Sequence, residues 1–195
     1  MPLELLPALL ISILLVGYSP GPANLFAFAM VLRHGRRTAL RMWCGLLVGF
    51  IFAATICVLA MHTFGVAFSA YVKYLKYVGA AYIFWLAVRM YKSRGKARKG
   101  RRACTFWSGF IVQATNAKII LYELTVYATF VLPYSERLVD LFVVAALLIL
   151  AGPGANLTWL LAGSVLRHFF VRYEHAADLV MSILLGACAV WIAFF

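Results

Sequence analysis

The sequence predicts an all-α integral membrane protein with six transmembrane helices, arranged as two inverted three-helix repeats. Of the 195 residues, 65% are hydrophobic, whereas soluble domains are about 45–50% apolar. The mean hydropathy is +0.94. The basic residues collect at the ends of long apolar runs, where membrane proteins place lysine and arginine. At this length, residues 1–195 are expected to form a single transmembrane domain.

Six apolar segments are long enough to cross a hydrocarbon core of about 30 Å, which takes about 20 helical residues. They run over about 3–32, 42–62, 71–91, 106–132, 138–166 and 176–194. The first segment offers Glu4 and no basic residue at its start. We therefore expect it to be retained as a span and not cleaved as a signal peptide.

The segments between these spans alternate in basic charge. Loops 33–41, 92–102 and 167–178 carry four, seven and two Lys or Arg residues, whereas 63–70 carries none and 133–138 carries one. The positive-inside rule places the first, third and fifth loops in the cytoplasm and both termini outside. Because the net charge of +12 follows this pattern, we interpret it as a topology signal. The expected partner is the lipid bilayer and not a nucleic acid.

The basic loop 92–103 divides the chain into a first repeat of about 1–91 and a second of about 104–195. Each half contains three predicted spans, so the first span enters the membrane from outside and the fourth from inside. If the halves are structurally related, they are related by inversion, an arrangement common in transporters.

Proline and glycine interrupt the first span near the middle of the membrane. Pro20, Gly21 and Pro22 lie roughly 25 Å along that helix, and proline removes a helical hydrogen bond. In the second half, "QATNAKII" (113–120) starts roughly 15 Å from the cytoplasmic side and contains Asn116 and Lys118. A third break is expected at "AGPGANL" (151–157).

Two charged residues lie inside the fourth predicted span. A lysine at the membrane centre costs about 2.5–3.5 kcal/mol on insertion scales. Lys118 either extends to an interface or faces a polar cavity and pairs with an anion. Glu123 either lies near the outer interface or has a role inside the span.

Three stretches carry a resemblance to a known family. "SPGPANLFAFAMVLRHGRRTAL" (19–40) resembles the first-helix signature of the LysE/RhtB family of amino-acid exporters. "YLKYVGAAYIFWLAVRMYKS" (74–93) and "FWSGFIVQATNAKIILYELTVYATFVLPY" (106–134) are similar to its third and fourth spans. The resemblance covers most of 15–134 and fades in the last two spans. The family typically has Asn-Pro-Lys where this chain has Asn116-Ala117-Lys118, so we expect span four to be less broken here.

The resemblance implies a secondary transporter of the bacterial inner membrane. It would export amino acids or small related metabolites from the cytoplasm, driven by the proton motive force. The predicted substrate-binding residues are Ser19, Pro20, Gly21, Pro22, Asn24, Asn116 and Lys118.

The predicted roles follow from the two ends of a broken helix. Backbone N–H groups of residues 23–25 would bind the substrate carboxylate, and carbonyls of Tyr18 and Ser19 would accept from its ammonium. Glu123 and Asp178 are the candidates for carrying the coupling proton.

Two other function classes are open alternatives, a membrane-embedded enzyme and a non-transporting membrane scaffold. An enzyme needs an acid/base or nucleophile constellation, and the spacing of the few acidic, Cys and His residues offers none. A scaffold has little reason to place Pro-Gly-Pro and Lys118 at one depth. We therefore expect no catalytic residue, metal or cofactor, and a homodimer is compatible with the sequence.

Overall fold

The computed structural model describes residues 3–65, 77, 81, 84–85, 87–88, 91–92, 104–171 and 174–194. All regular structure in these residues is helical. The predicted third span (71–91) lies mostly outside the described residues, as do loop 63–70 and the basic loop 92–103.

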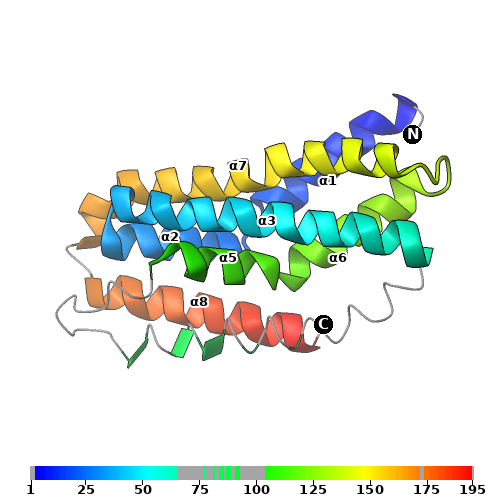
Figure 1. Cartoon of the computed structure of the whole chain (residues 1–195). Helices are drawn as coiled ribbons and strands as arrows, with labels where there is room; N and C mark the ends of the chain where they lie inside the picture. The colour runs from blue at the N-terminus through cyan, green and yellow to red at the C-terminus, as the bar shows by residue number, and fades with distance from the viewer. Residues whose placement is uncertain are drawn as a thin grey trace.

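The described residues of the first half form a short 3-10 helix and three α-helices: η1 Leu3–Leu5, α1 Leu6–Tyr18, α2 Pro22–His34 and α3 Arg36–Phe64. The second half forms four α-helices and one π-helical turn: α5 Phe106–Ala114, α6 Ala117–Val126, the π turn η4 Tyr127–Val131, α7 Leu138–Val171 and α8 Glu174–Phe194. Most of them lie side by side along one bundle (Figure 1).

Two helices among the described residues are long and apolar enough to cross a membrane, Arg36–Phe64 and Leu138–Leu166. A third span results if Leu6–Tyr18 and Pro22–His34 are counted as one helix bent by 44° at its break. The apolar helices thus agree with a multi-pass membrane protein. The full set of six predicted spans and their inverted relation stay predictions.

Among the described residues, the backbones of α3 and α5 approach each other very closely. A Cβ on Gly45 would overlap the Phe106 carbonyl, and a Cβ on Gly109 would overlap the Met42 carbonyl. On Gly49 it would lie 2.6 Å from the Phe110 carbonyl oxygen. Glycine lets the two backbones approach this closely, as small residues do in membrane helix pairs.

The core consists of two apolar clusters, one around α2 and one around α1, α6 and η4. Helix α2 is buried on every side from Pro22 to Leu32. In contrast, α1 exposes Leu10, Ile11, Leu14 and Leu15. Further large apolar side chains are exposed along α3 and α7. Contiguous apolar surface of this kind indicates contact with lipid.

The predicted loop 33–41 is wrong, because most of it is helical. Helix α2 ends at His34 and α3 starts at Arg36, so Arg36, Arg37 and Arg41 all belong to α3. Gly35 alone makes the turn, with φ 79° and ψ 166°, a conformation that glycine adopts without the penalty of a Cβ. A membrane helix can include these exposed arginines because they lie at its start, before its apolar part.

The predicted break at 151–157 is also wrong. Helix α7 continues through Pro153 to Val171. Pro153 removes one helical hydrogen bond, the one to the Ile149 carbonyl, without ending the helix. In the same turn the Trp43 indole N–H from α3 donates to the Pro153 carbonyl at 2.9 Å. Proline within a membrane helix is tolerated where neighbouring groups satisfy the freed backbone.

Candidate functional site

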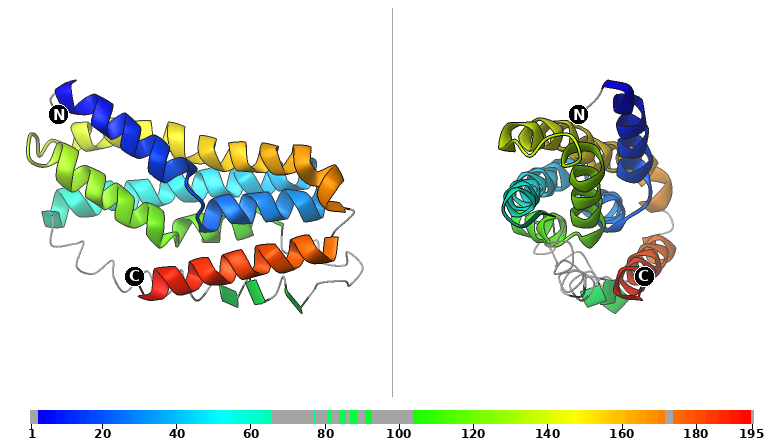
Figure 2. Two further views of the ribbon diagram at one scale, coloured as in Figure 1. Left: turned by 180° about the vertical axis from the view of Figure 1, so that it is seen from behind. Right: turned by 90° about the vertical axis from the view of Figure 1, so that its right-hand side faces the viewer.

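The first helix breaks where the proline pair predicts. Helix α1 ends at Tyr18 and α2 begins at Pro22, because proline at the first helical position needs no N–H partner. Between them, Ser19 and Gly21 are extended. The break lies near the middle of the bundle, beside the junction of α5 and α6 (Figure 2).

The carbonyls at the end of α1 are all paired with side chains. Asn24 Nδ2 donates to the Gly17 carbonyl at 2.8 Å and to the Ser19 carbonyl at 3.0 Å. Trp159 Nε1 donates to the Tyr18 carbonyl at 3.1 Å. The prediction that the Tyr18 and Ser19 carbonyls receive a substrate ammonium therefore meets competition from protein donors.

Lys118 joins the two halves of the chain. Its ammonium donates to Ser19 Oγ at 2.7 Å and to the Ser19 carbonyl at 3.2 Å. A cation at this position also stabilises the negative end of the α1 dipole. A Cβ on Gly21 would meet Lys118 Cδ and Nζ at 3.0 Å. Lys118 thus points into the break instead of extending to an interface.

The second break forms without a proline, contrary to our expectation. Helix α5 ends at Ala114, and Asn116 (φ −74°, ψ 91°) is the N-cap of α6. The Thr115 N–H bonds the Ile111 carbonyl, whereas the Asn116 N–H turns back to Gln113. Thr and Asn have low helix propensity, because their side chains compete for backbone groups. This allows the helix to end here.

Two helix N-termini meet at these breaks. Helices α2 and α6 start near the middle of the bundle and run toward opposite ends (Figures 1 and 2). The first amides of a helix have no intrahelical partner, which applies to Ala23, Asn24, Ala117 and Lys118. The Leu25 N–H is not among them, because it donates to the Gly21 carbonyl at 2.9 Å. The prediction of a free Leu25 N–H is therefore wrong.

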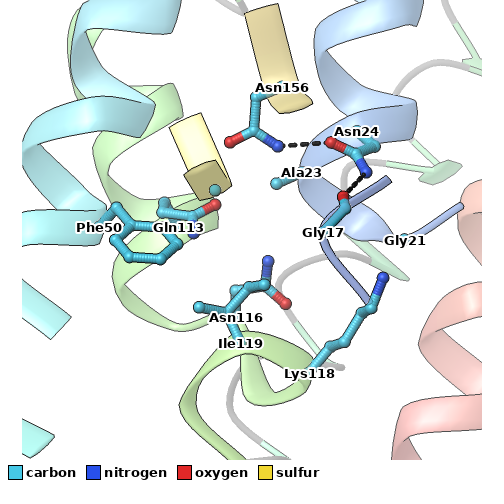
Figure 3. A pocket seen from close by; sticks show the side chains of 11 residues that line it. Gly17, Gly21, Ala23, Asn24, Phe50, Gln113, Asn116, Lys118, Ile119 and Asn156 are labelled. Carbon is cyan, nitrogen blue, oxygen red and sulfur yellow. Dashed lines mark hydrogen bonds between the residues drawn. The ribbon is translucent and has the colours of Figure 1, made fainter. Parts of the chain in front are cut away.

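A small pocket lies between the two breaks (Figure 3). Four sequence-predicted residues line it: Gly21, Asn24, Asn116 and Lys118. Ser19 does not line the pocket, but its hydroxyl accepts a hydrogen bond from Lys118. Pro20 and Pro22 shape the break but do not line the pocket. The cavity holds about 10 Å³, which is room for about one water molecule.

The sequence reasoning missed two polar residues of this pocket, Gln113 and Asn156. Asn156 Nδ2 donates to Asn24 Oδ1 at 2.6 Å, which ties α7 to the break in the first half. Both residues are at least 95% buried, with exposed fractions of 0% and 5%. The sequence could have indicated them, because each is a polar residue in a predicted break: Gln113 in "QATNAKII" and Asn156 in "AGPGANL".

Glu123 lies outside this pocket but deep in the protein. Its exposed fraction is 0%, and its carboxyl group contacts the Cys57 thiol, which is a weak hydrogen-bond donor. It lies beside the Cys57 thiol and the Tyr127 phenol. Glu123 is thus surrounded by protein side chains, and its depth in the membrane stays a prediction. Asp178 belongs to α8, but its side chain lies outside the described residues.

In the described part of the chain, no group of three or more His, Cys, Asp or Glu side chains could hold a metal ion. Polar chemistry near the breaks consists of amides, hydroxyls and one ammonium. This set suits reversible binding of a polar solute.

Comparison with known proteins agrees with this picture. The LysE type translocator family matches residues 14–195, including the last two spans, where we expected the resemblance to fade. The cysteine/O-acetylserine efflux protein of Escherichia coli (strain K12) is 36% identical over 183 residues, which is 93% of each chain. That of Salmonella paratyphi A is 35% identical over 182 residues, again 93% of each chain. No solved structure matches. The chain therefore belongs to the LysE type translocator family and is a membrane transporter, not an enzyme.

Proposed function

We propose that this protein exports small neutral amino acids or closely related metabolites across the bacterial inner membrane. The observation that carries the proposal is the pocket between two broken helices, lined by Lys118 and by four amide side chains. The names of the relatives point to the same substrate class, since both are cysteine/O-acetylserine efflux proteins.

The pocket offers separate places for the charges of an amino acid. The N-termini of α2 and α6 carry partial positive charge, and the Lys118 ammonium adds a full one. A substrate carboxylate would bind there and replace Ser19 as the hydrogen-bond acceptor of the Lys118 ammonium. Helix ends at broken helices bind carboxylates in this way in other transporters.

The small size of the pocket supports transport by alternating access. A cavity of about 10 Å³ cannot hold an amino acid, so α1 and α2 must separate from α5 and α6 to admit one. The hydrogen bonds from Lys118 to Ser19 are the polar link that breaks when this happens. The opposite directions of α2 and α6 support an inverted repeat in which either half rocks against the other.

Glu123 is the candidate for the coupling proton in an antiport cycle. A carboxyl with no exposure, whose hydrogen-bonding neighbour is the weakly donating Cys57 thiol, is much less costly when protonated. It lies five residues after Lys118, which is roughly 7.5 Å along the same helix. Glu123 is thus close enough to Lys118 for a movement of α6 to change the protonation of its carboxyl group.

The test is export from cells loaded with cysteine-containing dipeptides. Cells that express the protein should release more cysteine than cells with an empty vector. Lys118→Ala and Pro20→Ala should each abolish the difference while both variants insert into the membrane at normal levels. Full export by both variants would overturn the proposed site. Equal release with and without the protein would overturn the proposed function itself.

A further inference from the structure

Three amide side chains of the pocket are buried with unpaired polar atoms. Gln113 has no partner for Oε1 or Nε2, and Asn116 and Asn156 have none for Oδ1. Their exposed fractions are 0%, 2% and 5%. Buried amides nearly always make hydrogen bonds, so three of them around one cavity need a common partner.

The orientation of Asn156 follows from its hydrogen-bond chain. The carbonyls of Gly17 and Ser19 can only accept, so Nδ2 of Asn24 must face them and Oδ1 must face Asn156. Asn156 therefore presents its own Nδ2 to Asn24. Its Oδ1 is left as an acceptor on the side away from Asn24, as Figure 3 shows.

We infer that Gln113, Asn116 and Asn156 form a subsite for the protonated amino group of the exported substrate. An ammonium group has three N–H donors and no acceptor, which matches the three unpaired carbonyl-type oxygens. The alternative acceptors at the end of α1 are already paired with Asn24, Trp159 and Lys118.

The subsite also fixes which way the substrate lies. Lys118 and the helix N-termini attract a carboxylate, whereas the unpaired amide oxygens are acceptors and suit the ammonium. An α-amino acid would place its ammonium at the amides and its carboxylate at Lys118. Because the amides are neutral, the pocket favours an amino acid whose side chain carries no charge. This inference rests on the proposed function, since it names how the same pocket recognises its substrate.

The experiment measures counterflow of labelled L-cysteine into proteoliposomes that contain the full-length protein and unlabelled cysteine under reducing conditions. Two competitors are compared, L-cysteine and 3-mercaptopropionate, which has the same carboxylate and thiol but no amino group. The wild type should prefer cysteine by about tenfold or more, because a charged hydrogen bond discriminates by at least this factor.

Two substitutions at one position should move this preference in opposite directions. Gln113→Met keeps the size of the side chain but has no oxygen, so the preference for cysteine should fall toward unity. Gln113→Glu adds a negative charge beside the ammonium and should raise the preference for cysteine. Thr158→Val is the matched control, because Thr158 is exposed and its hydroxyl bonds only the Gly154 carbonyl of its own helix.

The outcomes separate the two proposals. If the wild type shows no cysteine counterflow, the proposed function fails. If counterflow is normal but both Gln113 variants keep the wild-type preference, water fills the amide subsite and this inference is wrong. If Gln113→Met does not fold, Gln113→Glu still decides the question. A rise in its preference for cysteine supports the inference, and an unchanged preference overturns it.

Discussion

At the scale of single residues, the space beside Gly21 determines where Lys118 can lie. Gly21 has an extended backbone that alanine adopts equally well, but its new Cβ would lie 3.0 Å from Lys118 Cδ and Nζ. Gly21→Ala should push the ammonium from Ser19 and reduce export by roughly tenfold, the value of one charge-assisted hydrogen bond.

Gly17→Ala is a sharp control for this prediction. Gly17 lines the same pocket, but a Cβ there would make only an ordinary contact of 3.8 Å with Ala155. Export rates measured at equal membrane levels should therefore stay near wild type for Gly17→Ala. Equal loss in both variants would show that the pocket tolerates no added methyl group, and the specific role of Lys118 would be rejected.

A second residue-scale prediction concerns Glu123. Glu123→Gln has nearly the same volume and cannot exchange a proton, so it should uncouple transport without emptying the buried position. In proteoliposomes, cysteine counterflow should continue, whereas accumulation driven by an imposed pH gradient should be lost. Accumulation at the wild-type level would exclude Glu123 as the proton carrier.

At the scale of helices, the contact of α3 with α5 depends on glycine. The Cβ of Gly109→Ala would overlap the Met42 backbone carbonyl, which cannot move as a side chain could. Overpacking of this kind costs about 1–3 kcal/mol. The variant should therefore melt several degrees below wild type in detergent.

The control is Gly154→Ala in α7, where a Cβ would meet nothing within 4 Å. Alanine has a higher helix propensity than glycine by about 1 kcal/mol, so the melting temperature should stay unchanged or rise. Unchanged melting of Gly109→Ala would contradict the close α3–α5 contact.

The sequence predicts elements best where one residue type determines the backbone. Pro20 and Pro22 located the first break correctly, and long apolar runs located α3 and α7. Pro153 misled, because a proline removes one helical hydrogen bond without necessarily ending a long apolar helix, and α7 continues through it. The break at Thr115 and Asn116 has no proline to signal it.

Long-range pairs explain the remaining misses. The Asn24–Asn156 hydrogen bond joins residues 132 apart, and no local pattern indicates such a partner. Lys118 and Ser19, 99 residues apart, could be placed at one depth from the sequence. Their direct contact could not, because the rotation of each helix about its axis depends on tertiary packing.

At the scale of the whole molecule, the charge pattern and the bundle agree on an orientation. Both chain termini lie toward the same end of the bundle in Figure 1, and the corner between α2 and α3 lies at the other end. Arg36, Arg37 and Arg41 are exposed at that corner. The positive-inside rule would place the corner in the cytoplasm and both termini outside.

Reporter fusions test this orientation. Alkaline phosphatase is active only outside the cytoplasm and green fluorescent protein folds to a fluorescent state inside it, so a fusion after Phe195 should give active phosphatase and little fluorescence. A fusion after Arg102, in the basic loop 92–103, should give the reverse. Replacing Arg36, Arg37 and Arg41 by Gln should weaken the contrast, because basic residues near the ends of spans determine which side they occupy. Fluorescence of both fusions would place the C-terminus inside, and an inverted relation of two three-span halves would then be impossible.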